Sequence, residues 1–275
     1  MTRPLAAALA VAGLACSAQQ RVATEMALAE ALVSDEQEKQ IGLAVREDLK
    51  KENVRYLEDA TVTGYVKEVS GKILRLASRD RPGVEWSVKV IDDPKTVNAF
   101  ATPGGFLYVY SGLLLAAADT AEVAGVLAHE AGHVVARHSA RQMVNAMGIE
   151  AVTRVALGAD PGATAQLAAG FAGKTLLLAH SRSEEIEADA LGARYTSGAG
   201  YDPRGIATFF QRLEAGSGGS PGGLSWLSTH PPSSERVEKV NRYIAANKLT
   251  AKGGRDPAPL AKVKARLKAL PAPAR

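Results

Sequence analysis

The sequence predicts an α+β fold that is mainly helical and contains a small sheet of about three strands. Apolar residues recur at helical spacing over residues 35–52 and 60–78, and again from Asp119 nearly to the end of the chain. Strand patterns are confined to residues 85–110. With 275 residues, of which 46% are hydrophobic and 23% charged, the chain is long enough to bury a large core without crosslinks.

Residues 1–16 are predicted to be a signal peptide and not part of the fold. Arg3 supplies a short positive region, and the apolar run over residues 5–15 is shorter than the roughly 20 residues that cross a bilayer as a helix. Cys16, the only cysteine, stands where a bacterial lipoprotein signal is cut and lipidated. Because Gly13 occupies the position where such signals usually carry Leu, ordinary cleavage nearby, for example after Ala18, is one alternative. A buried apolar N-terminal helix is the other.

Either signal implies export, and the lipid would tether a periplasmic protein to an envelope membrane. A single cysteine also excludes an intramolecular disulfide and a zinc site built from several thiolates. We therefore expect the exported chain to rely on its core for stability.

The folded domain is predicted to span residues 34–247, after a linker over residues 17–33. Ser34 and Gln37 form a capping-box pattern that opens the first helix. The second helix ends before the helix-breaking pair Pro82-Gly83. The three strands are expected at residues 85–91, 98–101 and 106–110.

Residues 248–275 are predicted to form a basic C-terminal tail. A short helical pattern there carries Lys262, Lys264, Arg266 and Lys268. A solvated tail is the favoured interpretation, and attraction to an anionic membrane surface is the alternative. For the whole chain, 33 basic and 29 acidic residues give a net charge of +4, which does not indicate a nucleic-acid partner.

The most informative motif is His129-Glu130-Ala131-Gly132-His133, within a helix predicted to open at Thr120 and to run to His138. Residues four apart project from one face of a helix, so both imidazoles can bind one tetrahedral Zn²⁺. Glu130 lies beside that face and can take a proton from a water molecule activated by the zinc. The alternative is a helix with two exposed or core histidines. The neighbouring residues are apolar, however, and such a set of polar side chains on a buried helix is costly without a metal.

A catalytic zinc needs a third protein ligand and an open fourth position. Ser181 and Glu184 form a second capping-box pattern, which opens another helix. On this helix Glu184, Glu185 and Glu187 are all candidates for the carboxylate ligand, and spacing does not choose among them. Asp189 shares a face with Glu185 and can accept the second N–H of a ligating imidazole. The alternative is a solvated acidic helix start, which the helix dipole favours in any case.

Several segments together resemble the HtpX-like, CAAX-prenyl-protease family of zinc metalloendopeptidases. They are H-E-A-G-H at 129–133, S-R-S-E-E-I-E-A-D-A-L-G at 181–192, N-A-F-A-T-P-G-G at 98–105, Y-S-G-L-L at 110–114 and S-T-H-P-P-S-S-E-R at 228–236. The resemblance covers residues 34–245, and its motifs are specific in combination. It implies a gluzincin-type metallopeptidase domain, with the sheet beside the zinc helix and one Zn²⁺ per chain.

The resemblance also implies roles for individual residues. In that family the first Glu of the E-x-x-x-D pattern is the third zinc ligand, which here selects Glu185 and makes Asp189 the carboxylate that supports a ligand. His138 recurs in the family after H-E-x-x-H, where a place beside the ligands or in helix packing is favoured over ligation. His180 is expected to be structural or exposed.

Two further residues each keep two interpretations. In the resembled family a histidine in the context of Thr229-His230-Pro231 can approach the zinc and block or assist the open position. Otherwise, His230 is a loop histidine that caps the next helix. Arg236 either orients the substrate or pairs with an acidic neighbour.

The leading functional hypothesis is a zinc endopeptidase of the bacterial envelope that cuts unfolded or misassembled proteins. The strand that contains Asn98, Ala99 and Phe100 is implied to be the sheet edge beside the zinc, where an extended substrate would add through main-chain hydrogen bonds. The alternative is a zinc-bearing chaperone or scaffold for outer-membrane protein assembly with little proteolysis. A His230 held on the metal would keep the resting state inactive. A purely structural zinc protein fits poorly, because structural sites are usually closed by four protein ligands.

The chain also departs from the best-known members of the resembled family. Those are integral membrane enzymes with several spanning helices, whereas the sequence after residue 16 contains no stretch long and apolar enough to be one. We therefore expect it to resemble the soluble, exported bacterial branch. The oligomeric state and the natural substrate do not follow from the sequence.

Overall fold

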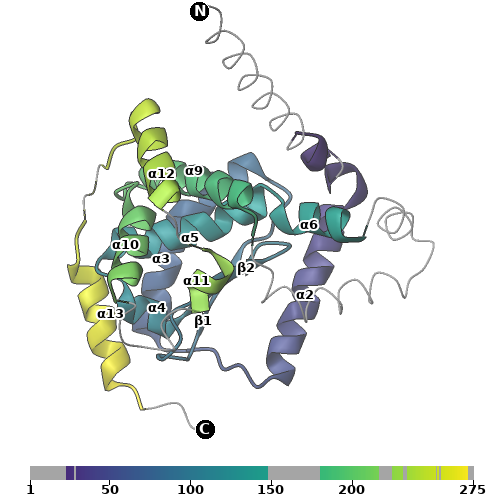
Figure 1. Ribbon diagram of the computed structural model, residues 1–275. Helices are drawn as coiled ribbons and strands as arrows, with labels where there is room; N and C mark the ends of the chain where they lie inside the picture. Colours follow the sequence, from purple (N-terminus) through teal and green to yellow (C-terminus); the bar gives the residue numbers. More distant parts are fainter. Residues whose placement is uncertain are drawn as a thin grey trace, which may run out of the picture.

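The computed structural model describes residues 23–27, 29–147, 180–216, 225–231, 234–251, 253 and 255–271. Within them, helices dominate and one small sheet lies among them, as Figure 1 shows. The α+β prediction is therefore confirmed. The predicted signal peptide and Cys16 lie outside the described residues.

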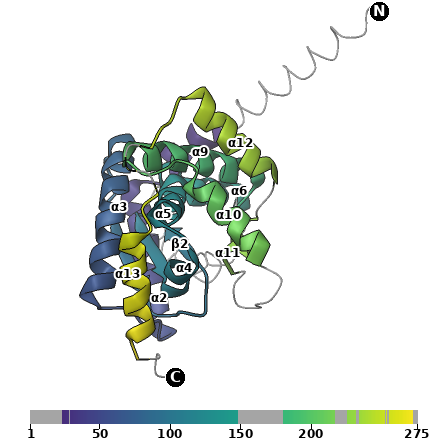
Figure 2. The ribbon, with the colours of Figure 1, turned by 90° about the vertical axis from the view of Figure 1, so that its left-hand side faces the viewer.

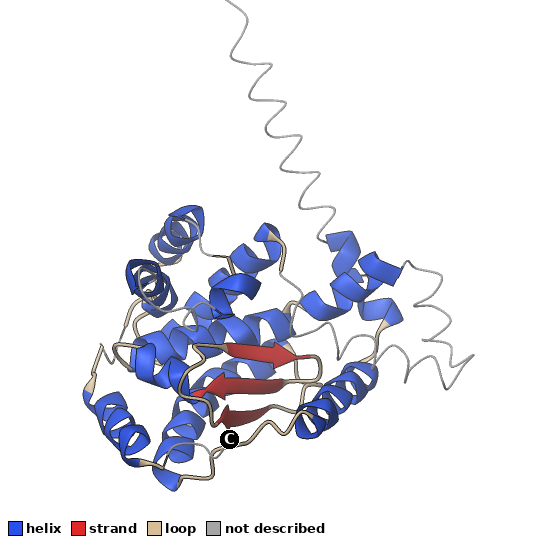
Figure 3. Ribbon diagram, turned by 60° about the horizontal axis from the view of Figure 1, so that its bottom comes forward, coloured by secondary structure: helices blue, strands red, loops and turns tan. Residues whose placement is uncertain are grey.

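The sheet consists of β1 (Ser87–Ile91), β2 (Ala99–Thr102) and β3 (Phe106–Tyr110) in the order β1-β3-β2 (Figure 3). β1 pairs with β3 in parallel, and β2 pairs with β3 in the antiparallel sense. The tight connection between β2 and β3 contains Gly104 and Gly105, whose φ angles of 81° and 90° favour glycine. Among the described strands β2 is thus an edge strand, as the resemblance implied.

The central helix is α5 (Thr120–Val135), which carries the H-E-x-x-H motif. The Glu122 backbone N–H donates to the Asp119 carboxylate at 3.0 Å, which caps the helix. Every residue of α5 except Val135 is buried, as expected of a helix that is covered on all sides. It packs against α3 (Ala60–Asp80), α9 (Arg182–Gly198) and α10 (Gly205–Gly216), so the motif lies inside the main core.

Two glycines allow α5 and α9 to approach each other closely. A Cβ atom on Gly132 would meet the Ala188 carbonyl oxygen at 3.0 Å, and one on Gly192 would meet the His129 backbone nitrogen at 3.1 Å. Both contacts are tighter than ordinary side-chain packing. The close approach brings the acidic first turns of α9 to the histidines of α5.

The predicted helix from Thr120 to His138 is in fact two helices. α5 ends at Val135, and α6 (His138–Met147) follows after a turn at Arg137, which has a left-handed φ of 55°. Periodicity did not reveal this break because both helices are apolar on their buried faces. The turn places His138 beside His133, as described below.

The N-terminal part of the described chain corrects the prediction of a linker. Residues 23–27 and 29–32 are helical, and Ala29 and Val33 are buried in a small cluster against α2 (Asp35–Lys51) and α6. α2 begins with the predicted capping box, in which Gln37 N–H donates to Ser34 Oγ at 3.2 Å. An ion-pair cluster then fastens α2 to the ends of α3 and α5. Its members are Asp35, which is partly exposed, and the buried residues Glu38, Arg81 and Arg137.

The C-terminal segment corrects the prediction of a solvated tail. Residues Ala258–Ala269 form α13, which packs along α3 and against α4 (Ser111–Ala116), as Figure 2 shows. Leu260 and Val263 are buried in the main core, and Arg266 Nε lies 2.7 Å from the Asp59 carboxylate. The apolar residues between the lysines therefore decide the position of this segment. No helix in the described part of the chain combines the length and the apolar character needed to span a membrane.

Candidate metal centre

Four side chains that can bind a metal converge between α5, α9 and α11 (Ser225–Thr229). They are His129 and His133 from α5, Glu185 from α9, and His230, which directly follows α11. Their ligand atoms all lie within 4.8 Å of one another, and all four residues are buried. Glu130, next to the first of them, is also buried. The structure therefore brings together the predicted ligands, the predicted general base and His230, for which the sequence left two positions open.

The spacing of the donor atoms fits zinc. The Nε2 atoms of His129 and His133 are 2.9 Å apart, and the Glu185 oxygens lie 3.6 and 3.5 Å from them. In a tetrahedral site with Zn–N bonds of about 2.0–2.1 Å, neighbouring ligand atoms are separated by roughly 3.3 Å. Two imidazoles and a carboxylate are also the donor types that catalytic zinc sites use. We infer that these three residues would hold a zinc ion.

The carboxylate of Asp189 prepares His129 as a ligand. Its Nδ1 lies 2.9 Å from Asp189 Oδ1. An ionised carboxylate can only accept a hydrogen bond, so Nδ1 carries the proton and Nε2 keeps its lone pair for the metal. Burial raises the pKa of the Asp189 carboxyl, but Arg236 and His129 outweigh burial and lower it overall. Asp189 therefore lies where the sequence predicted it, beside the second ring nitrogen of a metal-binding histidine.

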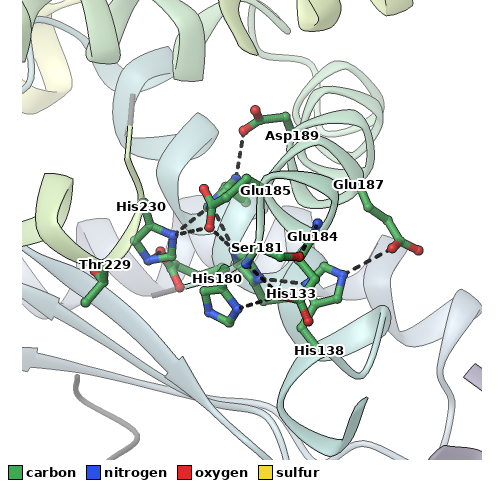
Figure 4. Close-up of polar contacts among 12 residues, drawn as sticks. His133, His138, His180, Ser181, Glu184, Glu185, Glu187, Asp189, Thr229 and His230 are labelled. Atoms are coloured by element: carbon green, nitrogen blue, oxygen red, sulfur yellow. Dashed lines mark hydrogen bonds and ion pairs between the residues drawn. The ribbon is translucent and has the colours of Figure 1, made fainter. Parts of the chain in front are cut away.

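A second chain of contacts reaches His133. Its Nδ1 lies 2.7 Å from His138 Nδ1, and His138 Nε2 lies 3.2 Å from Glu187 Oε2, which also accepts from Arg141 at 2.8 Å (Figure 4). Burial raises the pKa of Glu187, but His138 and Arg141 outweigh it, so the net pKa is lowered and the carboxylate is ionised. His138 then donates from Nε2 to Glu187 and accepts from His133 at Nδ1. His133 Nε2 is consequently left unprotonated and faces the site.

The electrostatics of the site favour a cation among the ligands. Burial, and next to it His180, holds the pKa of His133 well below its usual value, so this imidazole is neutral. Burial also lowers the pKa of His230, but Glu130 and Glu185 outweigh that effect and raise it overall. For Glu185 burial raises the pKa, yet His230, His129 and Arg236 lower it well below the ordinary range. The Glu185 carboxylate therefore stays ionised and attracts positive charge to the place where the metal would lie.

The structure distinguishes the three glutamates between which spacing could not choose. Glu185 alone belongs to the ligand cluster. The Glu184 carboxylate accepts from the Ser181 backbone N–H at 2.8 Å, which completes the predicted capping box. Glu187 points to the other side of α9, toward His138, as Figure 4 shows. The selection of Glu185 agrees with what the resemblance implied.

Arg236, on α12 (Ser234–Ala246), pairs with acidic neighbours, which was one of its two interpretations. Its Nε and one terminal nitrogen each lie 2.8 Å from an oxygen of Asp189, and the other terminal nitrogen lies 2.6 Å from Glu185 Oε2. Arg236 is 3% exposed, and its guanidinium offsets the two buried negative charges of Asp189 and Glu185.

His230 reaches the ligand cluster itself. Its Nδ1 lies 2.9 Å from Glu185 Oε1 and 3.3 Å from His129 Nε2, and its Nε2 lies 3.5 Å from Glu130 Oε1. These contacts place it near the metal, which was one of its two interpretations. His230 is therefore the fourth residue whose ligand atom lies in the cluster and could hold a metal.

A groove lies beside the metal centre. Asn98, Phe100 and Ala101 line it together with Glu130 and His133 of α5. Because Tyr110 N–H donates to the Asn98 carbonyl at 3.0 Å, alternation along the strand turns the backbone groups of Ala99 and Ala101 toward the open edge. The predicted substrate strand therefore borders the metal centre, and Ala99 and Ala101 carry its outward-facing N–H and C=O groups.

Sequence reasoning missed two residues of the site. His180, expected to be structural or exposed, is half-buried in the groove and stacks on His133 with a ring-centroid distance of 3.9 Å. Trp226 is fully buried, and its indole N–H donates to Glu130 Oε1 at 3.1 Å. The only sequence signal for Trp226 is its position four residues before His230; Trp226 lies in the short helix α11, and His230 directly follows it.

A buried H-E-x-x-H helix, a carboxylate ligand from a second helix and an edge strand beside them define a zinc-dependent metallopeptidase domain. The sequence profile of Peptidase family M48 matches residues 60–244, and the chain belongs to this family. The match begins at the first residue of α3 and ends within α12, so it contains every residue of the metal centre described above.

Known relatives support this assignment. The chain is 35% identical to the mitochondrial metalloendopeptidase OMA1 of Schizosaccharomyces pombe over 66% of its own length and 53% of that protein. It is 35% identical to the metalloprotease YcaL of Escherichia coli over 60% and 64% of the two chains. It is 30% identical to a putative beta-barrel assembly-enhancing protease of Vibrio cholerae over 70% of its own length and 42% of that protein. In each case the matched region is less than two thirds of the relative.

Proposed function

We propose that the protein is a zinc-dependent metalloendopeptidase that hydrolyses peptide bonds of unfolded or extended proteins. The observation that carries this proposal is the convergence of His129, His133 and Glu185 at ligand spacing, with Glu130 beside them in a groove bordered by an edge strand. Within the family, the quoted N-A-F-A-T-P-G-G and S-T-H-P-P-S-S-E-R segments favour an HtpX-like protein, and the signal-like pattern before Cys16 favours the exported bacterial branch.

In the proposed reaction the chain supplies the proton transfers and the orientation of the substrate. Zinc bound by the three ligands would lower the pKa of water and polarise the scissile carbonyl. Glu130 takes the proton of the attacking water and later gives it to the leaving amine. Asp189 and His138 hold the two imidazoles with their Nε2 lone pairs facing the metal.

The edge of β2 supports an extended substrate. The outward-facing backbone groups of Ala99 and Ala101 can pair with a substrate strand, which would then lie along the groove beside Glu130. Main-chain pairing requires an unfolded or extended segment and imposes little sequence preference. Zinc-loaded protein should therefore cleave unfolded casein, and Glu130→Gln should not; this comparison, argued in the Discussion, tests the proposal against a scaffold that binds without cutting.

We further propose that His230 closes the site in the resting state. Its Nδ1 lies among the ligand atoms, and a zinc with four protein ligands has no place for water. The side chain follows the short helix α11, so a local displacement of residues 229–231 would open the fourth position. This closed state also accounts for the alternative of a chaperone-like protein with little proteolysis.

His230→Ala is expected to raise peptidase activity on unfolded casein, because it leaves the fourth position to water. If the site is open for one tenth of the time, the rise is about tenfold. Zinc content, measured by atomic absorption, should stay near one per chain, and His230→Gln should behave like the alanine variant. A loss of activity with the metal retained would show instead that His230 assists the reaction.

The compartment is proposed from the N-terminal sequence. The apolar run before Cys16 favours export and lipidation, which would place the protein in the periplasm at an envelope membrane. Labelled palmitate fed to bacteria that express the full chain should enter the wild type and not Cys16→Ser. Incorporation into neither protein would reject lipidation at this position.

A further inference from the structure

Trp226 connects the candidate general base to the core. It is 0% exposed, and its indole N–H donates to Glu130 Oε1 at 3.1 Å. A hydrogen bond from a neutral donor to a carboxylate is stronger than one between neutral groups. With Oε1 held in this way, Oε2 is the oxygen left to take the proton of the attacking water.

The indole itself is held in place by aromatic packing. Its ring stacks on Phe210 with a centroid distance of 5.1 Å and an interplanar angle of 20°, and it meets the edge of Phe209 at 5.6 Å. Both phenylalanines lie on α10 and are buried in the main core. The donor is therefore part of the packed interior, whereas His230, four residues later, borders the groove.

The backbone of Trp226 is hydrogen-bonded to the segment that leads into β2, the strand that would receive the substrate. Its N–H donates to the Val97 carbonyl at 3.2 Å. By the alternation along β2, Val97 faces the same outward edge as Ala99 and Ala101. Trp226 thus ends the open edge on one side and, through its side chain, fixes the carboxylate that lies beside that edge.

We propose that Trp226 is a positioning residue that aims the Glu130 carboxylate at the attacking water and sets it relative to the substrate strand. This role rests on the proposed function, because it needs Glu130 to be the general base. The hydrogen bond itself does not depend on that function and can be tested separately.

The first experiment observes the hydrogen bond without any activity measurement. The chain has two tryptophans, so ¹⁵N-tryptophan labelling gives two indole resonances, and Trp86→Phe assigns them. In metal-free protein the Trp226 indole proton should resonate downfield and exchange slowly, and Glu130→Ala should move it upfield while Trp86 stays unchanged. A Trp226 resonance that does not respond to Glu130→Ala would overturn the proposal. This experiment leaves Trp226 unchanged, so it remains decisive even if a variant at Trp226 does not fold.

The second experiment asks whether the bond matters for the reaction. Trp226→Phe keeps an aromatic ring against Phe210 but removes the donor, so kcat on a peptide substrate should fall about tenfold, equivalent to about 1.4 kcal/mol. KM and zinc content should stay within twofold, and Trp86→Phe, the same change at a site outside the groove, should leave kcat unchanged. Wild-type kcat in Trp226→Phe would reject the positioning role. Inactive wild-type protein would instead reject the proposed function, and the resonance experiment would still decide whether Trp226 holds Glu130.

Discussion

Glu130→Gln is expected to lower peptidase activity by about 10³-fold and to leave the zinc in place. General acid–base groups contribute roughly 10²–10⁴-fold to enzymatic rates, and an amide cannot take a proton from water near neutral pH. Glu130 lies in the groove but outside the ligand cluster, so metal binding does not need its charge. Gln also keeps an oxygen that can accept from the Trp226 indole, so the packing around residue 130 should persist.

The measurement is the rate of casein cleavage by zinc-loaded wild type and Glu130→Gln, with the zinc content of both. Glu184→Gln is the matched control, because Glu184 is also a buried carboxylate near the site but serves the cap of α9. Activity in Glu130→Gln close to that of the wild type would remove Glu130 as the general base. No cleavage by the wild type, with zinc bound, would favour the scaffold alternative.

Glu185→Gln is expected to lose the metal. Glu185 supplies the only carboxylate of the ligand cluster, and its two oxygens lie 3.5 and 3.6 Å from the histidine nitrogens. Removing this charge should weaken zinc binding by more than the roughly 10–100-fold that loss of a supporting partner costs. Activity should disappear together with the metal, in contrast to Glu130→Gln, where the metal remains.

Zinc content after dialysis against a weak chelator checks this expectation. Glu184→Gln and Glu187→Gln are controls on the same helix, because Glu184 caps α9 and Glu187 contacts His138. Glu184→Gln should keep full occupancy, and Glu187→Gln should keep more zinc than Glu185→Gln. None of these substitutions removes the contact between Arg236 and Asp189, so we expect the fold to survive in every variant. The thermal unfolding midpoint of each variant checks this. Full occupancy in Glu185→Gln would overturn its assignment as the third ligand.

The elements that the sequence predicted well depend on local interactions. The capping boxes at Ser34 and Ser181 open α2 and α9 as expected, because a cap is formed within one helical turn. The strands were found within two residues of their ends, and β3 has the predicted bounds, because alternation and β-branched residues act locally. His129 and His133 share a face for the same reason, since helix geometry alone sets residues four apart side by side.

The elements that the sequence misassigned depend on partners far away in the chain. Residues 258–269 resemble a basic tail in composition, yet Leu260 and Val263 pack into the core on α3 and α4. Likewise, the apolar pattern around Ala29 and Val33 is too short to predict a helix, but both side chains are buried against residues of α6. The break between α5 and α6 depends on a positive φ at Arg137, which composition does not reveal.

By itself, the sequence predicted the H-E-x-x-H helix with two zinc ligands and a general base, because these follow from spacing along one helix, and it offered three glutamates of a second helix as candidates for the third ligand. Spacing left Glu184, Glu185 and Glu187 open, and the resemblance favoured Glu185. Only the tertiary structure showed Glu185 in the ligand cluster together with His230, brought Arg236 beside it and revealed Trp226 as the donor to Glu130. These contacts join α5, α9, α11 and α12, which meet because Gly132 and Gly192 let α5 and α9 approach closely and the shared core fixes the rest. Spacing within a helix is set by backbone geometry, whereas contacts between helices are set by the packing of side chains that lie far apart in the sequence.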